Sequence, residues 1–140
     1  MKKHRNNIFV FSLFLLFSCS GDNDPEDAEL VGSWKLIEYL ADPGNGSGSF
    51  QPVNSDKTVT FHADKTITSN GKLCTFTIRA DAGKRGTGVY SLTDSIITPN
   101  DCTEQQHSNI YFEMDNNNLI IKYICVEGCA QKFKKTASTE

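Results

Sequence analysis

Residues 109–125, NIYFEMDNNNLIIKYIC, decide the fold. Large apolar residues alternate with polar ones on both sides of three successive asparagines: Ile110, Phe112 and Met114 before them, and Leu119, Ile121 and Tyr123 after them. Alternation with a period of two is typical of strands with one buried face. Asparagine tolerates the left-handed backbone that a tight hairpin turn requires. The stretch therefore predicts an antiparallel hairpin.

The same period continues outward from this hairpin along the chain. Two further stretches predict hairpins, and three predict single strands: TVTFHADKTITSNG (58–71) and GVYSLTDSIIT (88–98), then SWKLIEYLA (33–41), LCTFTI (73–78) and AQKFKK (130–135). No long segment with a helical period follows residue 30. About eight or nine short strands joined in sequence predict an all-β fold, a small antiparallel up-and-down barrel.

The N-terminus carries an export signal. Basic residues in positions 2–5 precede an apolar run at 8–17, which is too short to span a bilayer, so removal of 1–18 is expected. The motif Leu16-Phe17-Ser18-Cys19 resembles the lipobox of bacterial lipoprotein precursors. That resemblance implies that Cys19 receives a diacylglyceryl group and becomes the first mature residue. An ordinary secretory signal with an incidental cysteine is the alternative.

An acidic segment follows the predicted lipidation site. Residues 20–29, SGDNDPEDAE, contain five acids and no base, which predicts an extended, solvated tether. An acidic run after a lipidated cysteine resembles the surface-export signals of some Gram-negative lipoproteins. We expect an outer-membrane anchor, on the periplasmic face or at the cell surface. The expected organisation is a signal peptide (1–18), the lipidated cysteine with its tether (19–29) and one barrel domain (30–140).

The folded body is close to neutral. Of 14 basic and 17 acidic residues, three basic ones lie in the signal and five acids in the tether, which leaves 11 against 12. Nucleic-acid binding requires a basic patch, so this class of partner is not expected. We expect a monomer whose contact with the membrane is the lipid.

Four cysteines in the body predict two disulfides, because exported proteins meet an oxidising compartment. The sequence Cys125-Val-Glu-Gly-Cys129 predicts a three-residue hairpin loop with Gly128 in the left-handed conformation. This favours Cys125 with Cys129, and Cys74 with Cys102. The other two connectivities stay open at this point.

The body carries no recognisable catalytic or metal-binding motif in its sequence. Zinc on Cys125 and Cys129 with His62 and His107 is disfavoured because exported thiols are usually oxidised and the histidines lie in unrelated segments. Residues 44–49, GNGSGS, lack the register of a nucleophile elbow. We expect no enzyme activity, no cofactor and no bound metal.

Glu38 is an unusual case, because strict alternation along its strand places it on the same inward face as Trp34 and Leu36. A buried carboxylate needs a partner, and Arg79 or Lys122 is expected to supply it. The alternative is that Glu38 lies at the wet end of the barrel.

Two stretches resemble the lipocalin-like domains of exported bacterial lipoproteins: LVGSWKL (30–36), with its Gly-x-Trp signature, and LIIKYICVEGCAQKFKK (119–135). The resemblance implies that Trp34 packs at the closed end of the barrel under a late-strand cation, Lys132 or Lys134. It also implies that residues 42–56 form a lid over the open mouth, with Phe50 as the one large apolar side chain of this lid.

The central functional question is whether the interior is open, since an eight-stranded barrel holds either side chains or one small ligand. We expect a small apolar or amphipathic ligand at the mouth, bound by Trp34, Leu36, Glu38, Phe50, Phe61, Tyr90 and Phe112. The alternative is a filled barrel that acts as a surface interaction module, whose loops bind a protein or glycan. The large inward residues favour filling. Two loops are rich in glycine and are expected to be flexible: 42–56, and 80–88, which concentrates Lys84 and Arg85.

Overall fold

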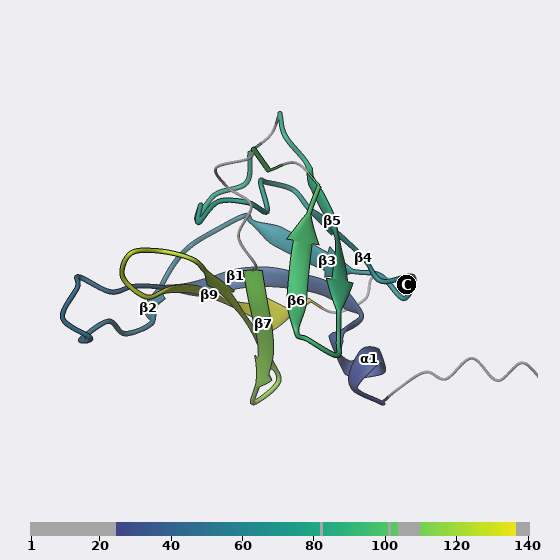
Figure 1. Ribbon diagram of the computed structural model, residues 1–140, viewed down its shortest axis with the longest axis horizontal. Coiled ribbons are helices and arrows are strands. Elements are labelled where there is room, and N and C mark those ends of the chain that lie inside the picture. Colours follow the sequence, from purple (N-terminus) through teal and green to yellow (C-terminus); the bar gives the residue numbers. More distant parts are fainter. Residues whose placement is uncertain (1–24, 82, 101, 104–109, 137–140) are drawn as a thin grey trace, which may run out of the picture.

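The computed structural model describes residues 25–81, 83–100, 102–103 and 110–136, with side chains from residue 28 onward (Figure 1). This part of the chain contains one helical turn and nine strands: α1 (Pro25–Leu30), β1 (Gly32–Ala41), β2 (Gln51–Pro52), β3 (Thr58–Phe61), β4 (Thr66–Ser69), β5 (Gly86–Ser91), β6 (Ile96–Pro99), β7 (Ile110–Asp115), β8 (Asn118–Tyr123) and β9 (Cys129–Lys135).

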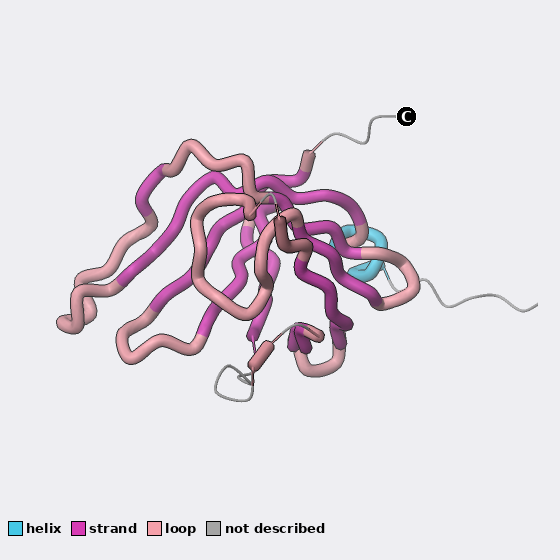
Figure 2. Tube along the Cα trace, turned by 90° about the horizontal axis from the view of Figure 1, so that it is seen from above, coloured by secondary structure: helices cyan, strands magenta, loops and turns pink. Residues whose placement is uncertain are grey.

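The strands form a closed antiparallel barrel, as the sequence predicted (Figure 2). Strands β3 to β9 follow one another in chain order, and β1 pairs with both β3 and β9, which closes an eight-stranded ring. The extra strand β2 continues the line of β3 along β1, where Glu38 pairs with Pro52 and Tyr39 with Gln51. Closure gives each of the eight barrel strands a hydrogen-bonded neighbour on both sides.

Short turns join the strands at the end of the barrel that carries α1, called here the α1 end. The β7–β8 turn is Asn116-Asn117, with φ of 47° and 63°, and Lys65 and Ser95 also have positive φ in the β3–β4 and β5–β6 turns. All three predicted hairpins are thus confirmed. The predicted tether differs at its last residues, because α1 occupies 25–30.

Trp34 closes the α1 end. Its indole Nε1 donates to the carbonyl of Leu30 at 2.9 Å, and the Lys135 ammonium lies 5.3 Å from the ring centroid. The cation is therefore Lys135, not the expected Lys132 or Lys134, because Lys135 is the residue in register with Trp34. Gly32 suits the position beside it, since its φ of +135° is a backbone conformation that residues with a side chain rarely adopt.

Long connections gather at the opposite end, called here the loop end: residues 42–57, 70–81 and 124–128. The predicted strand 73–78 is absent, and this segment instead crosses the opening with Leu73 buried and Ile78 packed against the core. In Figure 1, α1 lies at the lower right and the segment around residue 75 near the top.

Both preferred disulfides are present, Cys74–Cys102 and Cys125–Cys129, with Cα atoms 5.5 and 6.0 Å apart. The prediction of a three-residue loop was wrong. Strand pairing ends at Tyr123 and Cys129, so the loop has five residues, and Gly128 is not in the left-handed conformation. The disulfide supplies the closure that a tight turn otherwise gives.

Candidate functional site

The barrel interior is occupied by the side chains that were expected to line it. Phe61 lies 4.9 Å from Tyr90 and 5.6 Å from Phe112, measured between ring centroids and in edge-to-face geometry. Trp34 and Leu36 are each 1% exposed and belong to the same cluster. These five predicted ligand residues contact the core around them, so the structure assigns them to packing.

Glu38 does not point into the barrel. A β-bulge between Leu36 and Glu38 shifts the register against β9 and reverses the parity of the second half of β1. Tyr39 takes the inward place, opposite Gln131, and Glu38 instead forms an ion pair with Lys132 at 2.8 Å. The expected partners, Arg79 and Lys122, were wrong because the sequence alone assumed unbroken alternation.

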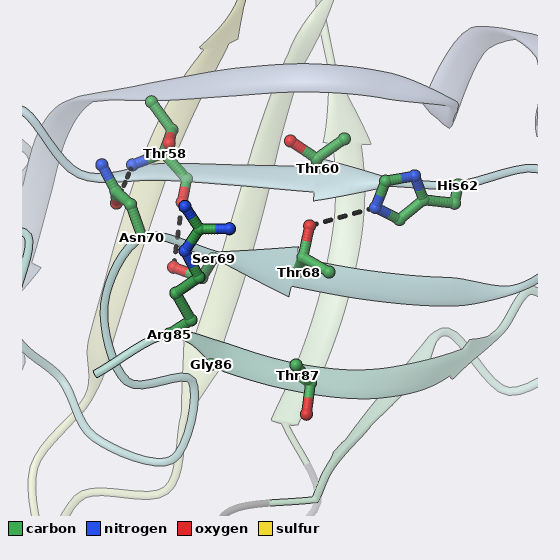
Figure 3. A pocket seen from close by; sticks show the side chains of 9 residues that line it. All are labelled: Thr58, Thr60, His62, Thr68, Ser69, Asn70, Arg85, Gly86 and Thr87. Carbon is green, nitrogen blue, oxygen red and sulfur yellow. Dashed lines mark hydrogen bonds between the residues drawn. The ribbon is translucent and has the colours of Figure 1, made fainter. Parts of the chain in front are cut away.

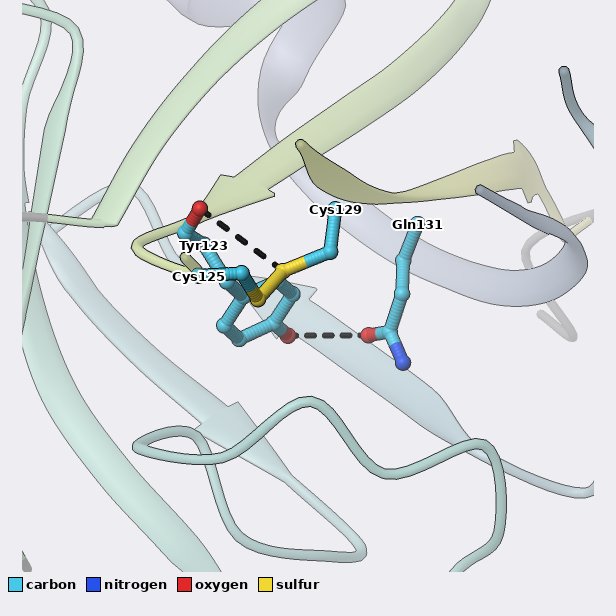
Figure 4. Close-up of a disulfide and its surroundings, with 4 residues drawn as sticks. All are labelled: Tyr123, Cys125, Cys129 and Gln131. Atoms are coloured by element: carbon cyan, nitrogen blue, oxygen red, sulfur yellow. Dashed lines mark hydrogen bonds between the residues drawn. A yellow bond between two sulfur atoms is a disulfide. The ribbon is translucent and has the colours of Figure 1, made fainter. Parts of the chain in front are cut away.

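A buried polar network lies near the loop end. Lys57 is completely buried, and its Nζ donates to the Thr77 carbonyl at 2.9 Å and to Gln131 Oε1 at 3.0 Å. Tyr123 donates its hydroxyl proton to the same Gln131 oxygen at 2.8 Å, as Figure 4 shows beside the Cys125–Cys129 disulfide. Burial lowers the pKa of Lys57 to about 8 and raises the pKa of Tyr123.

This network holds residues 70–81 over the opening. The Thr77 carbonyl also accepts from Gln131 Nε2 at 2.7 Å, and Ser55 Oγ donates to the Ile78 carbonyl at 2.6 Å. Phe76 packs beneath the segment, with its ring centroid 5.7 Å from Tyr123 and 6.3 Å from Tyr39. The region where a mouth was expected is therefore covered by bonded chain.

The loop after β1 is ordered around one carboxylate. Asp42 Oδ1 accepts from the backbone N–H of Gly44, Asn45 and Gly46, and its Oδ2 accepts from Gly48, at 2.7 to 3.1 Å. The bonds from Gly48 and Gly44 contribute most to lowering the pKa of Asp42. The expected flexible lid is instead folded against its own aspartate.

Phe50 lies outside the barrel, not over its mouth. Its ring centroid is 4.2 Å from the Lys132 ammonium. It helps to line an apolar groove of about 350 Å³ between this loop and the outer face of β8 and β9, with Leu40, Ile120 and Ala130. The ion pair of Lys122 with Glu113, at 2.6 Å, lies on the rim of the groove.

A polar hollow of about 410 Å³ lies on another part of the outer surface, over β3, β4 and β5 (Figure 3). Its lining is rich in hydroxyl groups and has no acidic residue: Thr58, Thr60, His62, Thr68, Ser69, Asn70, Arg85, Gly86 and Thr87. Figure 3 shows threonines from the three strands side by side, with Arg85 at one end and His62 at the other. His62 Nε2 and Thr68 Oγ1 are 3.0 Å apart.

A second polar hollow of about 560 Å³ adjoins the first and is lined by Lys35, Arg79, Asp56 and their neighbours. The two hollows are connected through Asn70, whose Nδ2 donates to the Asp56 carbonyl at 2.7 Å. The N–H of Ala80 and the nearby cations Arg79 and Lys35 lower the pKa of Asp56, so this carboxylate stays ionised.

Sequence reasoning missed both Lys57 and the polar hollow. Burial of Lys57 depends on residues 70–81 crossing the opening, and no local pattern encodes that path. The sequence carried a signal for the hollow: threonines alternate with apolar residues in 58–61 and 66–68, and Arg85 lies two residues before Thr87. Alternation was used to find the buried face and not to characterise the exposed one.

Few of the described residues could act as metal ligands or catalytic groups. Cys125 and Cys129 are joined to each other, which removes them as thiolate ligands, and no cluster of three or more histidine, cysteine or acidic side chains occurs in the described part of the chain. His107 and Cys19 lie outside the described residues. No helix within the described ranges is long and apolar enough to cross a membrane.

Comparison with known proteins adds no relative: no protein-family model matches the chain, and no curated protein matches it with significance.

Proposed function

We propose that this chain is a lipid-anchored envelope lipoprotein whose lipocalin-like barrel is a filled scaffold and whose outer surface binds a partner. The partner is a protein or a glycan, and the proposal assigns no catalysis. The observation that supports it most directly is the packing of Phe61, Tyr90 and Phe112 against one another in the interior.

A carrier of apolar ligands needs a dry cavity of several hundred cubic ångströms. Here the residues that would line such a cavity are buried and pack against one another, and residues 70–81 cover the loop end. The hollows described above lie on the outer surface, where Phe50, Arg85 and Lys35 contribute side chains. A binding role therefore fits the outside of the barrel better than the inside.

The lipid anchor is supported by sequence and by the position of α1. The lipobox-like motif ends at Cys19, and α1 begins at Pro25. Six residues of fully extended chain span at most about 20 Å, so an anchored Cys19 would hold the barrel close to the bilayer. In this arrangement the loop end is on the side of the barrel away from the anchor (Figure 1).

The anchor is tested by the mass and membrane retention of the protein. Mature protein extracted from membranes is expected to begin at Cys19 and to carry the mass of acyl chains, and Cys19→Ser is expected to leave the membrane fraction. A mature chain that begins before Cys19, or a Cys19→Ser variant that stays in the membrane fraction, would contradict the anchor.

A small apolar or amphipathic ligand remains a second candidate, relocated to the outer groove beside Phe50. The specific observation is the apolar floor of Leu40, Ile120 and Ala130 with Lys132 above the Phe50 ring. Such a groove has room for part of an acyl chain.

Titration of the full chain with a fluorescent fatty acid separates these alternatives. The filled-scaffold proposal predicts no saturable binding. Saturable binding that Phe50→Ala abolishes would favour the outer groove. Saturable binding that Phe50→Ala leaves unchanged, while a bulky substitution inside the barrel such as Ile97→Phe removes it, would overturn the filled interior.

A further inference from the structure

One outer face of the barrel carries a row of four hydroxyl residues on four neighbouring strands. The register pairs Ser33 with Thr60, Thr60 with Thr68, and Thr68 with Thr87. Strands lie about 4.8 Å apart, so the row is about 14 Å long. Threonine has few rotamers because it is branched at Cβ, so a strand holds its hydroxyl in a fixed place.

Cations accompany this row, although the folded body as a whole is nearly neutral. Arg85 lines the first hollow, and Lys35 and Arg79 line the second. The one acid among the lining residues, Asp56, accepts a hydrogen bond from the Ala80 N–H. The two hollows therefore carry more positive than negative charge.

Several of these groups are available to a ligand. Among the described residues, no hydrogen bond or ion pair engages the guanidinium of Arg85 or the hydroxyls of Thr58 and Thr87, and both Arg85 and Thr87 are exposed. Thr60 and Thr68 each have one polar neighbour, Ser33 and His62, and keep further hydrogen-bonding capacity.

The lining narrows the class of ligand. Protein partners are usually held by buried aromatic or aliphatic anchors, and single-stranded nucleic acids by stacked aromatic rings. Neither hollow has an aromatic residue other than His62. Fixed hydroxyls with an arginine and a lysine instead suit a ligand that presents many hydroxyls together with carboxylate, sulfate or phosphate groups.

We propose that the face formed by Ser33, Thr60, Thr68 and Thr87 with Arg85 and Lys35 binds an anionic oligosaccharide. The sugar hydroxyls meet the threonine row, and the acidic groups meet the cations at its edge. This inference rests on the proposed function, since it names the partner and the surface of the outer-face binding role.

Calorimetric titration of the full chain tests the proposal with defined probes. A sulfated heparin oligosaccharide and an oligogalacturonate of similar length distinguish sulfate from carboxylate as the acidic group, and a maltooligosaccharide is the neutral control. We expect saturable binding of at least one acidic probe, weakened by added salt, and no binding of the neutral one. Inorganic sulfate alone is expected to compete only weakly.

Two variants locate the site. Arg85→Gln is expected to weaken binding about tenfold, the loss of one charge-assisted hydrogen bond, and Thr68→Val to weaken it severalfold. Lys122→Gln makes the same charge change at the rim of the apolar groove and is expected to leave affinity within about twofold. Equal thermal unfolding midpoints for the variants confirm that they fold.

Three outcomes would overturn the proposal: no saturable binding of either acidic probe, equal losses for Arg85→Gln and Lys122→Gln, or binding of a protein or nucleic acid at this face with no binding of the oligosaccharides. If the oligosaccharides do not bind, the proposal of a filled scaffold still holds as long as the fatty-acid titration finds no fatty acid bound inside the barrel. A fatty acid bound inside the barrel would instead refute the proposed function itself.

Discussion

The two ends of the barrel are built by different means. The α1 end is closed by two- to four-residue turns and by Trp34, whose contacts lie close by in the sequence or in the neighbouring strand. The loop end depends on long connections, both disulfides and the buried Lys57. Short local turns form most of the first end, although the Lys135 contact with Trp34 joins distant segments, whereas the second end depends mainly on contacts between distant segments. We therefore expect the two ends to respond differently to substitution, reduction and pH.

The largest effect is expected at Trp34. Trp34→Ala removes a fully buried side chain and should lower the free energy of unfolding by about 4 kcal/mol. Trp34→Phe keeps most of the apolar volume but loses the bond to the Leu30 carbonyl, at a cost of about 1 to 2 kcal/mol. Urea denaturation measures both, and Val126→Ala, at a fully exposed position, is the control. A loss below about 1 kcal/mol for Trp34→Ala would contradict the role assigned to Trp34.

The next largest effect is expected when either of the two disulfides of the loop end is removed. Cys74 and Cys102 are 28 residues apart, and Cys125 and Cys129 are four apart. Loop-closure entropy predicts losses of about 3.5 and 2 kcal/mol when each pair is replaced by alanine. Urea denaturation of the two double variants gives the ranking. The reverse ranking would show that the Cys125–Cys129 bridge does more than shorten a loop.

The smallest of the three effects is the pH dependence that Lys57 introduces. Its pKa is about 8 in the folded protein and 10.5 in the unfolded chain, so the unfolded chain binds more protons between these values. Stability must therefore rise with pH in this window, by about 2 kcal/mol from pH 8 to 10. This rise in stability is expected only up to about pH 10. Above that pH the folded protein holds the Tyr123 proton more tightly than the unfolded chain does, because burial raises the pKa of Tyr123, and stability then falls with pH.

Lys57→Met provides the test, and Lys122→Met at an exposed position is its control. After Lys57→Met, Gln131 Oε1 still accepts from Tyr123, and the Thr77 carbonyl still accepts from Gln131. The variant should be at least as stable as the wild type at pH 7 and should lack the rise, whereas the control keeps it. An unchanged pH slope in Lys57→Met would remove Lys57 as its source.

Much of the fold was predictable from the chain alone. The hairpin formed as expected over residues 110–123, because alternation fixes which face is buried and the asparagines permit the turn. The two disulfide pairs that the sequence favoured are present, although the three-residue loop used to argue for Cys125–Cys129 did not form and the sequence left the other connectivities open. The predicted strand at 73–78 failed, since an alternating pattern also suits a segment that packs two or three side chains onto a barrel opening.

The candidate site was predicted less well. Glu38 was placed inward because a β-bulge leaves no mark in a period of two, and Phe50 was placed over a mouth that residues 70–81 cover. The threonine row requires the register of four strands, and only two of them, β3 and β4, are joined by a short turn. No single segment reveals that these hydroxyls lie side by side.

The sequence by itself determined an antiparallel all-β body and its short turns, because these depend on local periodicity and backbone preference. It favoured the cysteine pairs that formed but did not exclude the others. It also supplied the prediction of a lipid anchor at Cys19. The tertiary structure alone decided that the interior is packed, that Lys57 is buried and that polar hollows form on the outer face. These properties arise from strand register and from the path of long loops, where the stabilising contacts join residues far apart in the chain.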